Sequence, residues 1–121
     1  MKLKLIQICD RGIPNKERLW IKVVAPTYLD YYIVFDSSYS SPIAISTVPK
    51  YSFWFPHISV YPGDNIVLQT GSGIYSSKKD DISGTTTHCF YWGLGSVIWQ
   101  DKNSCAVLIE INNWETTSYT Q

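Results

Sequence analysis

The chain has 121 residues with ten basic and ten acidic side chains, so its formal net charge is zero. This length is typical of one domain with one core. Hydrophobic residues make up 45% of the chain, which excludes a disordered protein, and no apolar run approaches the roughly 18 residues of a spanning helix. Aromatic residues reach 15%, a proportion that favours β-strands. The composition therefore predicts a globular all-β domain.

Charge is unevenly distributed along the chain. Residues 1–25 carry six basic and two acidic side chains, a local charge of +4, and the other residues carry four and eight, a local charge of −4. The zero total excludes the strong overall basic field that drives non-specific nucleic-acid binding. A basic N-terminal quarter remains as a candidate binding region.

Strand signals recur from one end of the chain to the other. No segment of ten residues places apolar side chains at i, i+3, i+4 and i+7, so we expect less than about 10% helix. Clusters of Gly, Pro and Ser separate nine candidate strands. In chain order these are 2–9, 18–25, 31–36, 43–46, 51–55, 65–70, 87–92, 97–99 and 105–111.

Alternation within the strands assigns their faces, because successive side chains of a strand point to opposite sides. Strand 18–25 has one wholly apolar set: Leu19, Ile21, Val23 and Ala25. Strand 105–111 has another: Cys105, Val107, Ile109 and Ile111. These sets predict core faces, with Glu110 on the outer side of its strand. One dry and one wet face per strand is typical of antiparallel sandwiches.

Two connections carry clear signals. Tyr61-Pro62-Gly63-Asp64 has proline and glycine in the two central positions of a type II turn, and we expect it to join strands 53–55 and 65–70. Residues 71–86 are rich in Gly, Ser and Thr and include the self-neutralising tetrad Lys78-Lys79-Asp80-Asp81. This composition predicts a long mobile loop, the kind of segment in which function is often found.

Segment 51–71 resembles part of the lamin-tail domain. In that family an aromatic-rich strand ends in Phe-Pro, an apolar spacer leads to a Pro-Gly turn, and the next strand ends at glycine. The matching residues here are Phe55-Pro56, Pro62-Gly63 and Gly71. The features that follow also agree in order: a polar loop, Phe90-Tyr91-Trp92, Ile98-Trp99, a polar turn at 101–104 and an apolar strand at 106–109.

The resemblance covers about residues 1–113 and has departures. Glu17, Ile21 and Lys22 agree with a family strand of the form Glu-Tyr-Val-Glu-Ile-Lys, but Trp20 replaces an acid. The family's Gly-Trp before the third strand is missing, and its Gly-Asp before the last strand is reduced to Asn103-Ser104. The chain is thus similar to a divergent bacterial member, and a look-alike sandwich stays open.

The resemblance implies an immunoglobulin-like antiparallel β-sandwich of about seven to nine strands. The single domain would span 1–121, with an ordered core over 1–113 and a tail over 114–121. Lamin tails of eukaryotes engage proteins and chromatin, and the bacterial relatives are accessory domains, so the resemblance also implies function by binding. Fold alone does not decide function.

Candidate catalytic residues are few. His57 and His88 are the only histidines, and His88 next to Cys89 on a strand would point to the opposite face. No nucleophile, phosphate-binding or zinc-protease motif is present, and Lys78-Lys79 argues against calcium at Asp80-Asp81. We therefore expect no enzyme activity, no cofactor and no metal site, with a small enzyme of unrecognised site as an open alternative.

Cys9, Cys89 and Cys105 are an odd number of cysteines without Cys-x-x-Cys spacing, which favours buried, reduced thiols over disulfides or zinc. The N-terminal residues lack the cleavage site of a signal peptide. Both observations predict a cytoplasmic protein without membrane association.

Trp20 is the leading candidate for recognition. It lies between Arg18 and Lys22 on the side of its strand opposite the apolar set, so it is either covered by a second layer or an exposed aromatic flanked by cations. The candidate binding residues are Arg18, Trp20, Lys22, Lys2 and Lys4. Such a patch predicts a cytosolic binding module for another protein or for self-association. Binding of nucleic acid or another anionic polymer is the alternative.

Overall fold

The structure is a computed structural model that describes residues 1–119. It is all-β, with 45% strand and 3% helix, and it has the two packed sheets of a β-sandwich. The predicted fold class is confirmed. The number of strands is 11 rather than seven to nine, because the described chain also contains short strands that no apolar alternation marks. Of the predicted tail over 114–121, residues 114–119 form no helix or strand, and residues 120–121 lie outside the described residues.

The larger sheet has five strands in the order β1-β2-β8-β10-β9. Their bounds are Leu3–Cys9 for β1, Arg18–Val23 for β2, Asn65–Gln69 for β8, Thr86–Tyr91 for β10 and Ser76–Lys79 for β9. Neighbouring strands are antiparallel except β8 and β10, which are parallel. The prediction of a purely antiparallel sandwich is therefore wrong at this pair, because a crossover, and not a hairpin, connects β8 to β10.

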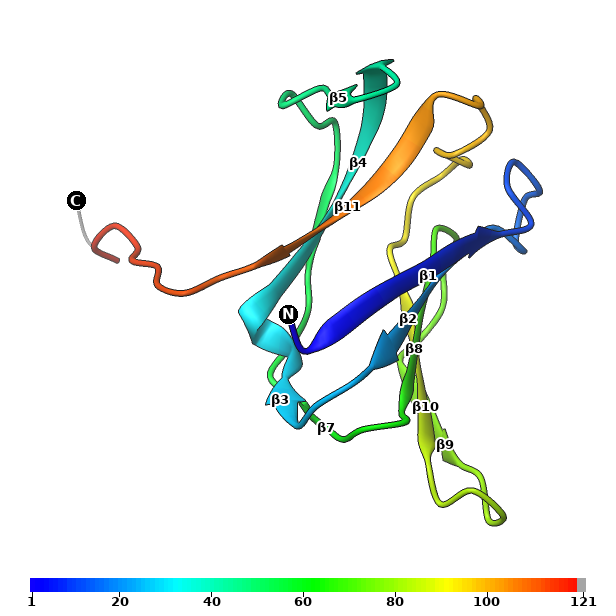
Figure 1. Ribbon diagram of the computed structural model, residues 1–121, viewed down its shortest axis with the longest axis vertical. Helices are drawn as coiled ribbons and strands as arrows, with labels where there is room; N and C mark the ends of the chain where they lie inside the picture. Colours follow the sequence, from blue (N-terminus) through cyan, green and yellow to red (C-terminus); the bar gives the residue numbers. More distant parts are fainter. Residues whose placement is uncertain (120–121) are drawn as a thin grey trace.

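The second sheet has β4 (Tyr32–Ser41) at its centre. On one side β4 pairs with β11 (Ser104–Glu110), and on the other with β6 (Ser52–Trp54) and with β5 (Ala44–Ile45) near its far end. In Figure 1 this sheet and the five-stranded sheet form two facing layers.

A third, two-stranded sheet closes one end of the sandwich. It pairs β3 (Thr27–Tyr28) with β7 (Ser59–Val60), and the short 3₁₀ helix η1 (Leu29–Tyr31) follows β3 and leads into β4. The Pro62-Gly63 turn forms as predicted, with Gly63 at φ +92° and the Asp64 N–H bonded to the Tyr61 carbonyl at 3.0 Å. It joins β7 to β8, whereas we expected strand 53–55 to lead into it.

The core lies between the facing layers. Its buried apolar residues are Leu3, Leu19, Ile21, Val23, Leu29, Tyr32, Val34, Phe55, Val60, Ile66, Leu68, Phe90 and Trp99. The predicted inner set of strand 18–25 is confirmed for Leu19, Ile21 and Val23. Segment 97–99 is not a strand, but its Trp99 is fully buried.

The face prediction for the last strand is confirmed for Cys105, which is buried, and is wrong for Val107 and Ile109. Ala106 and Leu108 pack against the core, while Val107 and Ile109 line a groove on the outer side of β11. Glu110 is exposed at the end of β11, and its carboxylate accepts a hydrogen bond from the buried Tyr32 hydroxyl at 2.5 Å. Burial, followed by this bond, raises the pKa of Tyr32 to about 12. A buried hydroxyl needs an acceptor, and Glu110 supplies it.

Segment 71–86 is more regular than we predicted. It contains β9, whose residues Ser76–Lys79 pair antiparallel with β10 to form a hairpin. All four β9 side chains are exposed. The sequence shows no alternation here because the strand is at the edge of the sheet and buries neither face.

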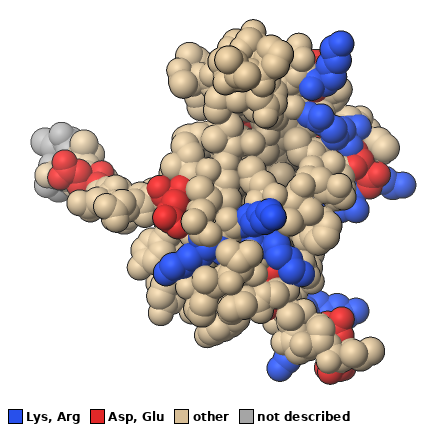
Figure 2. Space-filling model, viewed as in Figure 1, with Lys and Arg blue, Asp and Glu red and all other residues tan. Residues whose placement is uncertain are grey.

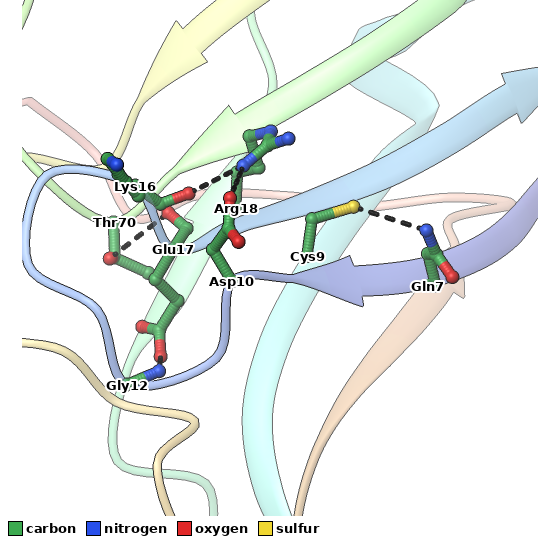
Figure 3. A network of polar contacts seen from close by, with 8 residues as sticks. All are labelled: Gln7, Cys9, Asp10, Gly12, Lys16, Glu17, Arg18 and Thr70. Atoms are coloured by element: carbon green, nitrogen blue, oxygen red, sulfur yellow. Dashed lines mark hydrogen bonds and ion pairs between the residues drawn. The ribbon is translucent and has the colours of Figure 1, made fainter.

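A buried carboxylate fastens the loop between β1 and β2. The Glu17 side chain is 1% exposed, and it accepts hydrogen bonds from the backbone N–H groups of Gly12 at 2.7 Å, Ile98 at 2.9 Å and Trp99 at 3.2 Å. Its own carbonyl accepts the Thr70 N–H at 3.2 Å and the Thr70 hydroxyl at 3.5 Å, of which Figure 3 draws the second. Glu17 therefore connects three segments that are distant in sequence.

We expect Glu17→Gln to lower the free energy of unfolding by about 3 kcal/mol, because the amide removes the charge from three hydrogen bonds and turns a donor toward buried N–H groups. Urea unfolding followed by tryptophan fluorescence measures the change. Glu115→Gln, in the exposed tail, is the matched control. Equal stability of the two variants would contradict the role given to Glu17.

Candidate functional site

The outer face of the five-stranded sheet collects side chains from all five strands, which the strand pairing aligns in three rows. From β1 to β9, the first row is Lys4, Lys22, Asn65, Thr87 and Lys78, and the second is Gln7, Trp20, Val67, Cys89 and Ser76. The third, from β1 to β10, is Cys9, Arg18, Gln69 and Tyr91. We call this surface the basic face, because these rows hold four cations and no carboxylate.

Trp20 occupies a central position on the basic face and is half-buried. Its indole Nε1–H donates to the Asn65 side-chain oxygen at 2.9 Å, and the Lys22 ammonium donates to the same oxygen at 3.1 Å. Asn65 thus holds an aromatic ring and a cation in fixed relation. The structure places Trp20 outside the core, as an aromatic flanked by cations. A side chain held in advance loses less entropy when it binds.

Arg18 lies at one rim of the basic face, where an ion pair already engages it. Its guanidinium is 2.6 Å from the Asp10 carboxylate and donates to the Lys16 carbonyl at 2.9 Å (Figure 3). The hydrogen bond with Asp10 is the main cause of a raised pKa for Arg18. The unpaired positive charge of the face therefore comes chiefly from its lysines.

Of the five predicted binding residues, the structure brings four together on the basic face and leaves Lys2 apart. Lys2 precedes β1 and lines a hollow of about 330 Å³ with three tyrosines, Tyr28, Tyr31 and Tyr61. In Figure 2, lysine and arginine side chains gather near the start of β1 and along the right side of the molecule, while the region of β4 and β5 at the top is almost uncharged.

The sequence prediction missed Lys78 and Asn65. Lys78 was assigned to a loop, although β9 places it in the first row of the face. Beside it, a hollow of about 690 Å³ extends over Thr87 and Cys89 to the turn of the hairpin at Asp80. Asn65 had a signal, since it begins a predicted strand on the side opposite the apolar Ile66.

The two histidines lie in different surroundings. His57 is exposed and stacks on Tyr28 with its Nδ1 3.0 Å from Asp30. His88 is buried on the inner side of β10, with Nδ1 2.9 Å from the Tyr75 hydroxyl and Nε2 3.8 Å from Asp64. Cys89 lies on the basic face, so the predicted separation of His88 and Cys89 is confirmed.

Asp64, which lies next to His88, has a structural role. Its carboxylate accepts backbone N–H groups from Tyr61 and Thr86, each at 2.9 Å, and so ties the Pro62-Gly63 turn to the start of β10. With both oxygens committed, Asp64 stabilises the joint between two strands. The arrangement fastens Tyr75 against the sheet through His88.

The thiols and carboxylates offer no metal centre among residues 1–119, where no group of three or more His, Cys, Asp or Glu residues is close enough to hold an ion. All three cysteines are free, with Cys105 buried and Cys9 and Cys89 half-buried. In the same described part of the chain, no helix has the length and apolar character to cross a membrane.

Comparison of the chain with protein-family models, with curated proteins and with solved structures found no match in any of the three. The resemblance to lamin-tail domains therefore stays a prediction.

His88 should make stability pH-dependent. Burial lowers its pKa below 6.5 despite the nearby Asp64, so the folded protein resists a proton that the unfolded chain accepts. Stability is then fully present above pH 6.5 and falls as the pH drops below that value. We expect a lower urea midpoint at pH 5.5 than at pH 7.5. His88→Gln should reduce this difference, and the exposed-site control His57→Gln should retain it.

Proposed function

We propose that the chain is a non-catalytic binding module that engages another protein through the basic face. The observation that carries the proposal is the position of Trp20 on an open sheet face, hydrogen-bonded to Asn65. Lys22 lies on the same strand, Lys4 on the neighbouring strand and Lys78 at the far edge of the same face. Tryptophan is prominent among the residues that dominate protein interfaces. The lysines around it favour a partner surface rich in carboxylates.

The second row supports a protein partner over a purely ionic one. Trp20 and Val67 are adjacent across β2 and β8, and Cys89 continues the row onto β10. These side chains offer a small apolar centre within a charged rim, which is the usual anatomy of a protein interface. The three free cysteines favour the reducing cytoplasm as the place where the module acts.

Binding of an anionic polymer is a second candidate, favoured by the first row. Lys4, Lys22 and Lys78 lie at one level across the sheet, an arrangement that suits successive phosphates or carboxylates. Trp20 would then stack against a base or a sugar ring. We propose as well that the chain is related to lamin-tail domains and acts as an accessory module.

Trp20→Ala should weaken the partner interaction by about 2 kcal/mol or more, because a central aromatic anchor is lost. The experiment immobilises three proteins and compares what each retains from native lysate: the wild type, Trp20→Ala and Trp54→Ala. Trp54 is an exposed tryptophan on the other sheet, so its variant should retain the wild-type set. Retention of that set by Trp20→Ala as well would reject the basic face. Urea unfolding verifies that both variants fold.

Replacing Arg18 and Lys22 by Glu separates the two candidates. A polymer contact should weaken by orders of magnitude between about 50 and 200 mM salt and vanish in the double variant, because counterion release drives it. An aromatic-anchored protein contact should respond weakly to salt. An oligodeoxythymidine strand and polyglutamate are the probes, measured by fluorescence anisotropy beside the retained protein. Salt-sensitive binding of a probe, with no protein retained from the lysate, would favour the anionic polymer as the ligand.

A further inference from the structure

The free edges of the two sheets are not equally protected against pairing with another strand. β1 carries Lys4 and has a bulge between Leu5 and Gln7, and β9 ends in Lys78-Lys79. Lysines and bulges are the usual devices that keep sheet edges from pairing. β6 has only three residues. β11 has seven residues, no lysine and no register shift against β4.

The unpaired backbone groups of β11 can be assigned from its pairing with β4. The Tyr39 N–H donates to the Asn103 carbonyl and the Ile111 N–H donates to the Tyr31 carbonyl, which continues the ladder at odd-numbered residues. In an antiparallel pair the alternate residues turn their N–H and C=O groups to the other side. The free backbone groups are therefore those of Ala106, Leu108 and Glu110. The Ser104 carbonyl points to the same side, but it already accepts a hydrogen bond from Arg11.

Apolar side chains adjoin this edge on the outer side of the sheet. Val107 and Ile109 of β11 line a groove of about 160 Å³ together with Phe35 of β4 and Ile45 of β5. Ser37, Ser46, Thr47 and Pro49 complete the lining, so no charged side chain takes part. A long apolar edge beside an uncharged face is a surface on which strands associate.

We propose that β11 pairs with β11 of a second copy of this chain to form a twofold-symmetric dimer. An antiparallel register centred on Leu108 sets Leu108 against its counterpart and Ala106 against Glu110 of the second copy, twice. Three pairs with two bonds each give six backbone hydrogen bonds. In the same register Val107 and Ile109 are cross-strand neighbours on the outer face, which joins the apolar faces of both copies.

The charges favour a second copy as the occupant. In this register Glu110 of one copy lies opposite Ala106 of the other. Two residues from that alanine is Ser104, whose carbonyl accepts a hydrogen bond from Arg11 of its own copy. Each copy thus sets a cation diagonally across from the other copy's acid, twice by symmetry. Pairing through β1 or β9 would instead bring lysine against lysine. The inference does not rest on the basic face, which lies on the opposite sheet.

The oligomeric state of the full chain tests the proposal. Sedimentation velocity of the wild type between about 5 and 200 μM should show dimers whose fraction rises with concentration. Ile109→Lys should raise the dimer dissociation constant at least tenfold, because it places a charge between the two strands. Ile6→Lys is the matched control, since Ile6 has similar exposure, 39% against 37% for Ile109, but lies on β1 of the other sheet, and it should leave the constant unchanged.

Ala106→Pro is a second variant, because it removes an N–H of the free edge and none from the ladder with β4. It should also give monomers, with circular dichroism verifying the fold. In the wild type, the Leu108 and Glu110 amides should exchange more slowly at higher concentration. A wild type that stays monomeric at about 200 μM overturns the proposal. That result would point to another occupant of the edge, such as an extended peptide of another protein. A dimer that Ile109→Lys leaves intact also overturns the proposal.

Discussion

The Glu17 carboxylate is the constraint on which the arrangement of the sandwich depends. It is buried, and it is stabilised there because three backbone N–H groups from two loops converge on it. One of those loops carries Trp99, the largest fully buried side chain, whose indole N–H donates to the Cys105 carbonyl at the start of β11. The carboxylate therefore fixes the β1–β2 hairpin in the first sheet and, through Trp99, the last strand of the second. A charge with fewer donors could not remain buried at this depth.

The two outer faces of the sandwich differ in chemistry although both belong to sheets of similar architecture. The basic face combines lysines with a hydrogen-bonded tryptophan, whereas the outer side of β4 and β11 presents Phe35, Val107 and Ile109 without charge. A protein gains nothing in stability from apolar side chains that stay in water. In the proposed dimer the second copy would cover the apolar side chains that adjoin the edge of β11.

The strands that bury one face could be predicted from the sequence, and the others could not. β2 alternates between apolar and polar residues, so both its position and its inner face follow from the pattern. β9 buries neither face, and β3 and β7 have two residues each, so no period marks them. Trp20, Arg18, Lys22 and Lys4 could be grouped from alternation on β1 and β2. Lys78 and Asn65 join them only through pairing between strands distant in sequence, which one chain's local pattern does not contain.

The error at β11 has a different origin and carries information about association. Alternation compares the two sides of a strand, and in β11 both sides are apolar over Ala106 to Ile109, so Val107 and Ile109 outweigh the smaller Ala106 on the other side. In the structure Ala106 and Leu108 pack against the core, the Glu110 carboxylate accepts the Tyr32 hydroxyl, and Val107 and Ile109 lie on the outer side. A pattern rule that places the larger apolar set inside assumes that the folded monomer is the final state. In the proposed dimer, Val107 and Ile109, which the rule would have buried within one copy, are covered by the second copy instead.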